Sequence, residues 1–153
     1  MERSEKDQRW IDWAEQLFTI EKPENFTDLK HCEECAEHNE TLKKNDVKTI
    51  GMGELGSPAW DPICFCSVEG KLYYTPAFIR LSLDTIKQDF YLDQFLFHLI
   101  WDGDKNQYHQ ACSIEQRKFI ASFLTFMLEN HSQLLEENFS GDNLLQAHQI
   151  WSK

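Results

Sequence analysis

The sequence lacks a long hydrophobic run. No stretch approaches the roughly 18 apolar residues that a membrane-spanning helix needs, and residues 1–9 are highly charged, without the apolar segment of a signal peptide. These absences predict a cytoplasmic protein that does not enter the membrane. Because thiols stay reduced in the cytoplasm, we expect the five cysteines to be free, buried or metal-bound instead of paired in disulfides.

Basic side chains are also scarce. The chain has 15 Lys and Arg against 26 Asp and Glu, which gives a net charge of -11. A surface this acidic repels nucleic-acid phosphates and anionic membrane surfaces, whereas it attracts cations and basic proteins. The sequence also lacks a phosphate-binding loop, a dinucleotide fingerprint and an H-E-x-x-H motif. These absences count against common enzyme classes, and we assign no catalytic residue.

Enough apolar residues are present to build a core. Hydrophobic residues make up 41% of the 153 residues, and they include eleven Phe and five Trp. Apolar positions recur at helical spacing over residues 4–19 and 92–100, and again from the Ser113–Gln116 capping box to about Asn130. The predicted fold is a mainly α, single-domain helical bundle that spans residues 1–153.

The middle of the chain has a different composition. Residues 46–70 contain four of the six glycines and two of the four prolines, which are residues that interrupt helices. We expect a small β-hairpin or an irregular Gly/Pro-rich insert here. In the hairpin version, residues 63–68 and 72–74 are strands joined by a turn at Glu69–Gly70. Thr75–Pro76 then has the residue types that begin a helix.

Residues 31–38, His-Cys-Glu-Glu-Cys-Ala-Glu-His, contain four candidate metal ligands within eight positions. They lie on a helix expected from residue 27 or 28 to about 44. Cysteine and histidine are preferred zinc ligands, and structural zinc takes four. We predict a structural zinc site with Cys32 and Cys35 as its main ligands. Cys64 is the best ligand from outside the helix, and His38 and His31 compete for the remaining place. Such an ion would fasten a weakly apolar helix to the Gly/Pro-rich insert.

Two other interpretations of this cluster remain open. In the first, the cysteines pack as small hydrophobic residues and the histidines face solvent. In the second, Cys32 and Cys35 form a redox pair. A redox C-x-x-C usually follows a strand and lies at a helix N-terminus that lowers the thiol pKa. The neighbouring residues Glu33, Glu34 and Glu37 count against the redox interpretation, because acidic neighbours disfavour a thiolate.

The chain resembles a family of small bacterial proteins that is classified only as a domain of unknown function. The resemblance covers roughly residues 29–130. It rests on three segments, which are His31-Cys32-x-x-Cys35, Tyr73-Tyr74-Thr75-Pro76-Ala77-Phe78 and Ser113-Ile114-Glu115-Gln116-Arg117. It implies a compact, mainly helical fold and no particular activity. His38 is not a fixed element of the family motif, so the resemblance gives it no role as a ligand.

The sequence favours a small cytoplasmic, non-enzymatic protein that binds another protein and contains a structural zinc site. One alternative is a metal- or thiol-dependent enzyme that uses Cys32 and Cys35 with His98 or His109 as a base. A second alternative is an acidic antagonist or immunity-type protein that binds a basic partner.

Overall fold

The computed structural model describes residues 3–153, and this part of the chain contains helices and no strand. The prediction of a mainly α fold is therefore confirmed. The helices in chain order are α1 (Glu5–Leu17), α2 (Glu33–Lys43), α3 (Met52–Leu55), α4 (Val68–Asp84), α5 (Leu92–Ile100), α6 (Gln107–Ala111), α7 (Ile114–Glu137) and α8 (Gly141–Trp151). Three short 3-10 turns are η1 (Pro58–Trp60), η2 (Pro62–Phe65) and η3 (Gly103–Lys105).

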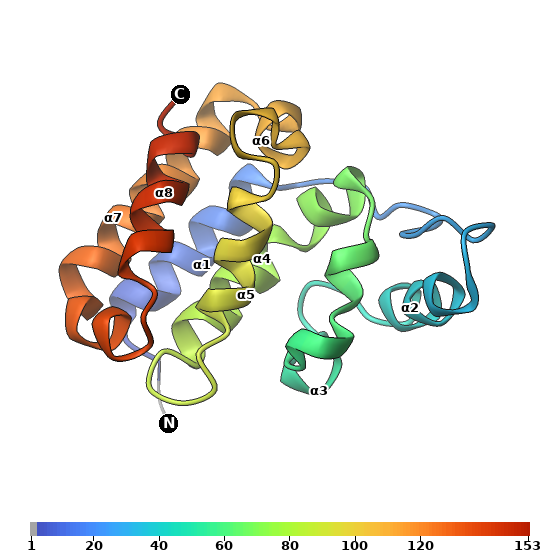
Figure 1. Cartoon of the computed structure of the whole chain (residues 1–153), viewed down its shortest axis with the longest axis horizontal. Coiled ribbons are helices and arrows are strands. Elements are labelled where there is room, and N and C mark those ends of the chain that lie inside the picture. The colour runs from blue at the N-terminus through green and yellow to red at the C-terminus, as the bar shows by residue number, and fades with distance from the viewer. Residues whose placement is uncertain (1–2) are drawn as a thin grey trace.

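The long helices pack around a core rich in aromatic side chains. Helix α7 packs against α8, α8 against α5, and α4 against both α1 and α5. Figure 1 shows α7 and α8 at one end of the molecule and α2 with α3 at the other, with α1, α4 and α5 between them. The largest fully buried side chains include Tyr74, Phe78, Phe95, Phe123 and Trp151. Burial of such rings provides most of the driving force for this packing.

The predicted β-hairpin is wrong. The residues expected to form its strands lie in η2 and in the first turns of α4. Ser67 caps α4 because its Oγ accepts a hydrogen bond from the Gly70 N–H at 3.1 Å, and this cap starts a helix where a turn was expected. The alternative of an irregular insert matches the structure, because residues 44–67 contain only α3, η1, η2 and turns.

Gly70 is a close-packing residue and not a turn residue. A Cβ added there would lie 2.3 Å from the Cys66 Sγ and 2.8 Å from the Phe26 Cδ1. Both distances are shorter than any van der Waals contact. Glycine therefore lets the start of α4 approach Phe26 in the segment that precedes α2.

Thr75 and Pro76 lie in the middle of α4 and not at its start, so this prediction is wrong as well. Proline inside a helix lacks the N–H that its hydrogen bond needs. Thr75 is fully buried, and its Oγ1 donates to the Lys71 carbonyl at 2.7 Å and contacts the Tyr108 hydroxyl. The Ser67 cap and the burial of both faces of α4 outweigh the cost of the proline.

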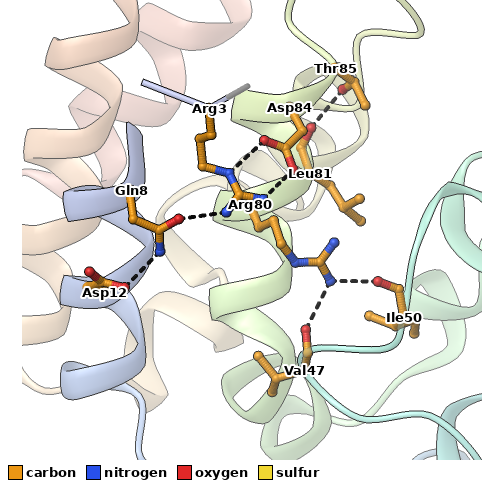
Figure 2. Close-up of polar contacts among 9 residues, drawn as sticks. All are labelled: Arg3, Gln8, Asp12, Val47, Ile50, Arg80, Leu81, Asp84 and Thr85. Carbon is orange, nitrogen blue, oxygen red and sulfur yellow. Dashed lines mark hydrogen bonds and ion pairs between the residues drawn. The ribbon is translucent and has the colours of Figure 1, made fainter. Parts of the chain in front are cut away.

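Two arginines attach irregular segments to α4, as Figure 2 shows. Arg80 donates to the carbonyls of Val47 at 2.9 Å and Ile50 at 2.6 Å. Arg3 donates to both carboxylate oxygens of Asp84 at 3.0 and 2.8 Å. The guanidinium of Arg80 thus satisfies two backbone carbonyls between α2 and α3 that have no partner in a helix or sheet.

Within residues 3–153, no helix is long and apolar enough to cross a membrane.

Candidate metal centre

Helix α2 begins about five residues later than the sequence suggested. Asp28 starts a turn in which its Oδ1 accepts from the Lys30 N–H at 3.0 Å and its carbonyl accepts from the His31 N–H at 3.2 Å. An aspartate that bonds the backbone two residues on competes with helix formation. Cys32 is consequently the N-cap of α2, with extended φ and ψ of -168° and 171°. Cys35 lies in the first turn of the helix.

This arrangement brings three metal-ligating atoms together. The Cys32 and Cys35 sulfurs are 3.3 Å apart, and the His31 Nδ1 lies 3.4 Å from the Cys35 sulfur. In a tetrahedral zinc site two sulfur ligands are about 3.8 Å apart, and a sulfur and an imidazole nitrogen are about 3.6 Å apart. The group could therefore hold a metal ion after shifts of a few tenths of an ångström. His31 and Cys32 are exposed, whereas Cys35 is buried.

The two thiols differ in acidity. The Cys35 backbone N–H donates to the Cys32 sulfur at 3.4 Å and lowers the pKa of Cys32, and the neighbouring Cys35 thiol and His31 ring act in the same direction. The hydrogen bond shared with Cys32, together with burial, raises the pKa of Cys35. The cap position therefore favours the thiolate on Cys32 despite the acidic neighbours, and the thiolate is the form that binds metals and attacks disulfides.

Buried contacts between α2 and the segment before it hold this group in place. The Asn39 Oδ1 accepts from the backbone N–H groups of Phe26 at 2.7 Å and Thr27 at 3.4 Å. The Thr27 hydroxyl donates to the carbonyl of Cys35. These buried hydrogen bonds join the segment before the cysteines to α2. Contacts within the protein therefore hold the turn at residues 28–31 in place without a metal.

The structure does not bring His38 to this group. Its ring lies between Trp60 and Phe65, with ring centroids 4.5 and 4.8 Å away. The side chain is fully buried, and within residues 3–153 neither ring nitrogen has a hydrogen-bond partner. His38 thus packs α2 against η1 and η2.

Cys64 lies in a second group, with Asp61 and His98. His109, the other base considered from the sequence, packs edge-on against Trp151 at 5.2 Å in a different part of the molecule. The sequence reasoning missed Asp61. Two signals could have found it: an Asp-Pro pair is a typical cap, and Gln94 and His98 are polar residues four positions apart on a mostly apolar helix.

In comparisons with protein-family models, curated proteins and solved structures, nothing matches this chain. The resemblance to a bacterial family therefore stays a prediction.

Proposed function

We propose that this protein is a non-enzymatic zinc-binding protein that holds the ion with His31, Cys32 and Cys35. The observation that carries the proposal is the meeting of these three ligand atoms within 4.8 Å of one another at the start of one helix. A cysteine binds zinc as the thiolate, so metal binding requires the thiol to lose its proton, which costs free energy. The hydrogen bond from the Cys35 N–H favours the thiolate of Cys32 and so reduces this cost.

A protein partner would complete the zinc shell. Structural zinc sites use four protein ligands, and within the described residues three meet at this place. Exposed apolar side chains lie on neighbouring segments: Leu29, two positions before His31, is 49% exposed, and Trp60 and Phe65, which pack on His38 one helical turn after Cys35, are 43% and 37% exposed. Exposed aromatic residues are typical anchors for a partner. The net charge of -11 favours a partner with a basic surface.

The zinc proposal can be tested by elemental mass spectrometry on protein purified without a His tag or a chelator. We expect the double variant Cys32→Ser/Cys35→Ser to contain one zinc equivalent less than the unmodified chain. Glu33→Gln, a change of one exposed neighbouring charge, should keep the same zinc content. An unchanged zinc content in the double variant would overturn the proposal.

Thermal unfolding distinguishes the contribution of Cys32 as a zinc ligand from its contribution as the N-cap of α2. Serine is at least as good an N-cap as cysteine, so Cys32→Ser should change the melting temperature of the metal-free protein by little. In the zinc-loaded protein the same substitution should lower the melting temperature sharply. An equal effect with and without zinc would mean that Cys32 acts only through packing or capping.

The open ligand position has its own test. Cobalt can replace zinc and gives visible absorption bands that report the ligands. If the chain supplies three ligands, added imidazole should enter the fourth position and shift these bands in a Cys64→Ala background. Bands that do not respond to imidazole would indicate a closed shell and would contradict the role of a partner as ligand.

A dithiol-disulfide exchange function is the second candidate, because Cys32 occupies a helix N-cap and its sulfur lies 3.3 Å from that of Cys35. In this reaction the Cys32 thiolate attacks a disulfide of a partner and releases one partner thiolate. The Cys35 thiolate, formed by loss of its proton, then attacks the mixed disulfide. The partner leaves as a dithiol, and Cys32 and Cys35 remain as a disulfide. Mass spectrometry in a glutathione redox buffer would show the loss of two hydrogen atoms, and no loss would exclude this candidate.

A further inference from the structure

A second group of ligating side chains is built from two segments that are distant in the sequence. Asp61 caps η2, where its Oδ1 accepts from the Ile63 N–H at 2.9 Å. Its Oδ2 lies 3.1 Å from the Nε2 atoms of both Gln94 and His98, which come from α5. The side chains of Asp61 and His98 are each only 2% exposed. A carboxylate and an imidazole this deeply buried are rare unless paired or bound to a metal.

Cys64 completes this group at the edge of a surface pocket. Its sulfur, the carboxylate of Asp61 and a ring nitrogen of His98 all lie within 4.8 Å of one another. Asp61 and Cys64 line a pocket of about 440 Å³, whose apolar walls include Phe97 and Phe139. The buried pair is therefore connected to solvent through the side on which Cys64 lies.

We propose that Asp61, Cys64 and His98 form a second metal centre for a zinc-class divalent cation. One carboxylate, one thiolate and one imidazole are all accepted zinc ligands, and three protein ligands leave the fourth position of a tetrahedral zinc site open. The open position would face the pocket and take water or a donor atom of a small ligand.

The geometry of the pair supports this assignment. Two ligands such as a carboxylate oxygen and an imidazole nitrogen are about 3.3 Å apart in a tetrahedral zinc site, and the Asp61 Oδ2 and His98 Nε2 are 3.1 Å apart. In the metal-free protein the hydrogen bond between them holds both ligands at nearly this distance. When a metal ion binds through these two atoms, the proton on the His98 Nε2 moves to the Nδ1, and the Cys64 thiol loses its proton to solvent.

Gln94 acts as a positioning residue for this centre. Its Nε2 donates to the Asp61 Oδ2 at 3.1 Å and to the Leu55 carbonyl at 2.7 Å. Hydrogen bonds of this kind orient a carboxylate ligand, and their loss typically lowers metal affinity by about 10- to 100-fold. Gln94→Ala should therefore weaken cobalt binding at this centre by about that factor.

The test is a titration of metal-free protein with Co²⁺, with the thiolate-to-cobalt absorption as the readout. The background is Cys32→Ser/Cys35→Ser, which removes the first group. We expect this variant to bind one equivalent of Co²⁺ and to lose that binding when Cys64→Ala is added. Cys64 is exposed, so this substitution should leave the fold intact, and circular dichroism checks it. Asp93→Asn, which removes a carboxylate from the same pocket, should keep the binding.

The variants separate the two proposed centres. No thiolate-cobalt band in the Cys32→Ser/Cys35→Ser background would overturn the second centre and leave the first intact. Binding that survives Cys64→Ala would also overturn it. A single equivalent in the unmodified chain that depends on Cys64 and not on Cys32 would support the second centre and overturn the first. Added azide should shift the cobalt bands of the second centre, and their insensitivity would contradict an open position.

Discussion

The two Cys/His groups of this chain are built in opposite ways. The first comes from residues 31–35, lies at the start of α2 and has two exposed members, His31 and Cys32. In the second, Asp61 pairs with His98, 37 positions along the chain, and both side chains are buried. A local group needs one turn and one helix start, whereas a non-local group exists only after η2 and α5 have packed. The two groups should therefore differ in their effect on stability and in their reactivity.

The largest expected difference is in stability. Asp61→Ala would leave three buried donors, on Ile63, Gln94 and His98, without the carboxylate they contact. Unpaired buried donors are costly, so we expect the free energy of unfolding of the metal-free protein to fall by about 3 kcal/mol. Urea unfolding followed by circular dichroism measures this loss.

Two control variants sharpen the test. Asp61→Asn keeps one carbonyl oxygen as an acceptor and should cost about half as much. Cys32→Ser, in the exposed group, should change the metal-free stability by less than about 0.5 kcal/mol because serine also caps helices. A loss below about 1 kcal/mol for Asp61→Ala would show that the buried network contributes little.

The second difference is in thiol reactivity of the metal-free protein. The pKa of Cys32 is lowered by the Cys35 N–H, whereas burial raises the pKa of Cys64 and raises the pKa values of Cys66 and Cys112 to about 12. Because the thiolate is the nucleophile, Cys32 should react first with iodoacetamide. Cys66 and Cys112 should react at least about 30-fold more slowly, after allowance for the greater nucleophilicity of more basic thiolates.

The pH dependence of alkylation should differ between Cys32 and Cys64. The rate at Cys32 should rise with pH and level off below the pH at which an ordinary thiol does, because its thiolate forms earlier. The rate at Cys64 should level off above that pH. Peptide mass spectrometry resolves the individual sites, and equal rates at Cys32 and Cys64 would contradict the assigned difference between the groups.

A more modest effect is expected at His38, whose ring packs α2 against η1 and η2. Its buried ring nitrogens have no partner within the described residues, so His38→Phe keeps a ring between Trp60 and Phe65 and removes two unpaired polar atoms. We expect a gain in unfolding free energy of about 1 kcal/mol and no change in zinc content. A lower zinc content in this variant would restore His38 as a ligand, as the sequence suggested.

Hydrophobic periodicity predicted three of the helices well. The stretches assigned over residues 4–19 and 92–100 correspond to α1 and α5, and the capping box at Ser113 opens α7 as expected. The predicted end of α7 near Asn130 coincides with a kink, because His131 has non-helical φ and ψ of -136° and 29° inside a helix that continues to Glu137. Local signals therefore located helices where an apolar face repeats over several turns.

Local signals failed where packing decided the conformation. Glu69–Gly70 and Thr75–Pro76 have the composition of a turn and a helix start, yet both lie inside α4. The close approach of Gly70 to Phe26 cannot be deduced from spacing along the chain. The same holds for the burial of Thr75 against Tyr108, since each contact joins residues from separate segments.

Composition and neighbours within one helical turn were enough to predict the mainly helical class, the acidic surface and the grouping of His31, Cys32 and Cys35. The enclosure of His38 by aromatic rings and the position of Cys64 beside Asp61 and His98 depend instead on how distant segments pack. The physical reason is that buried polar side chains find their partners across packed elements. Such partners can be any distance apart in the sequence, and solvation and packing select among them only in the folded chain.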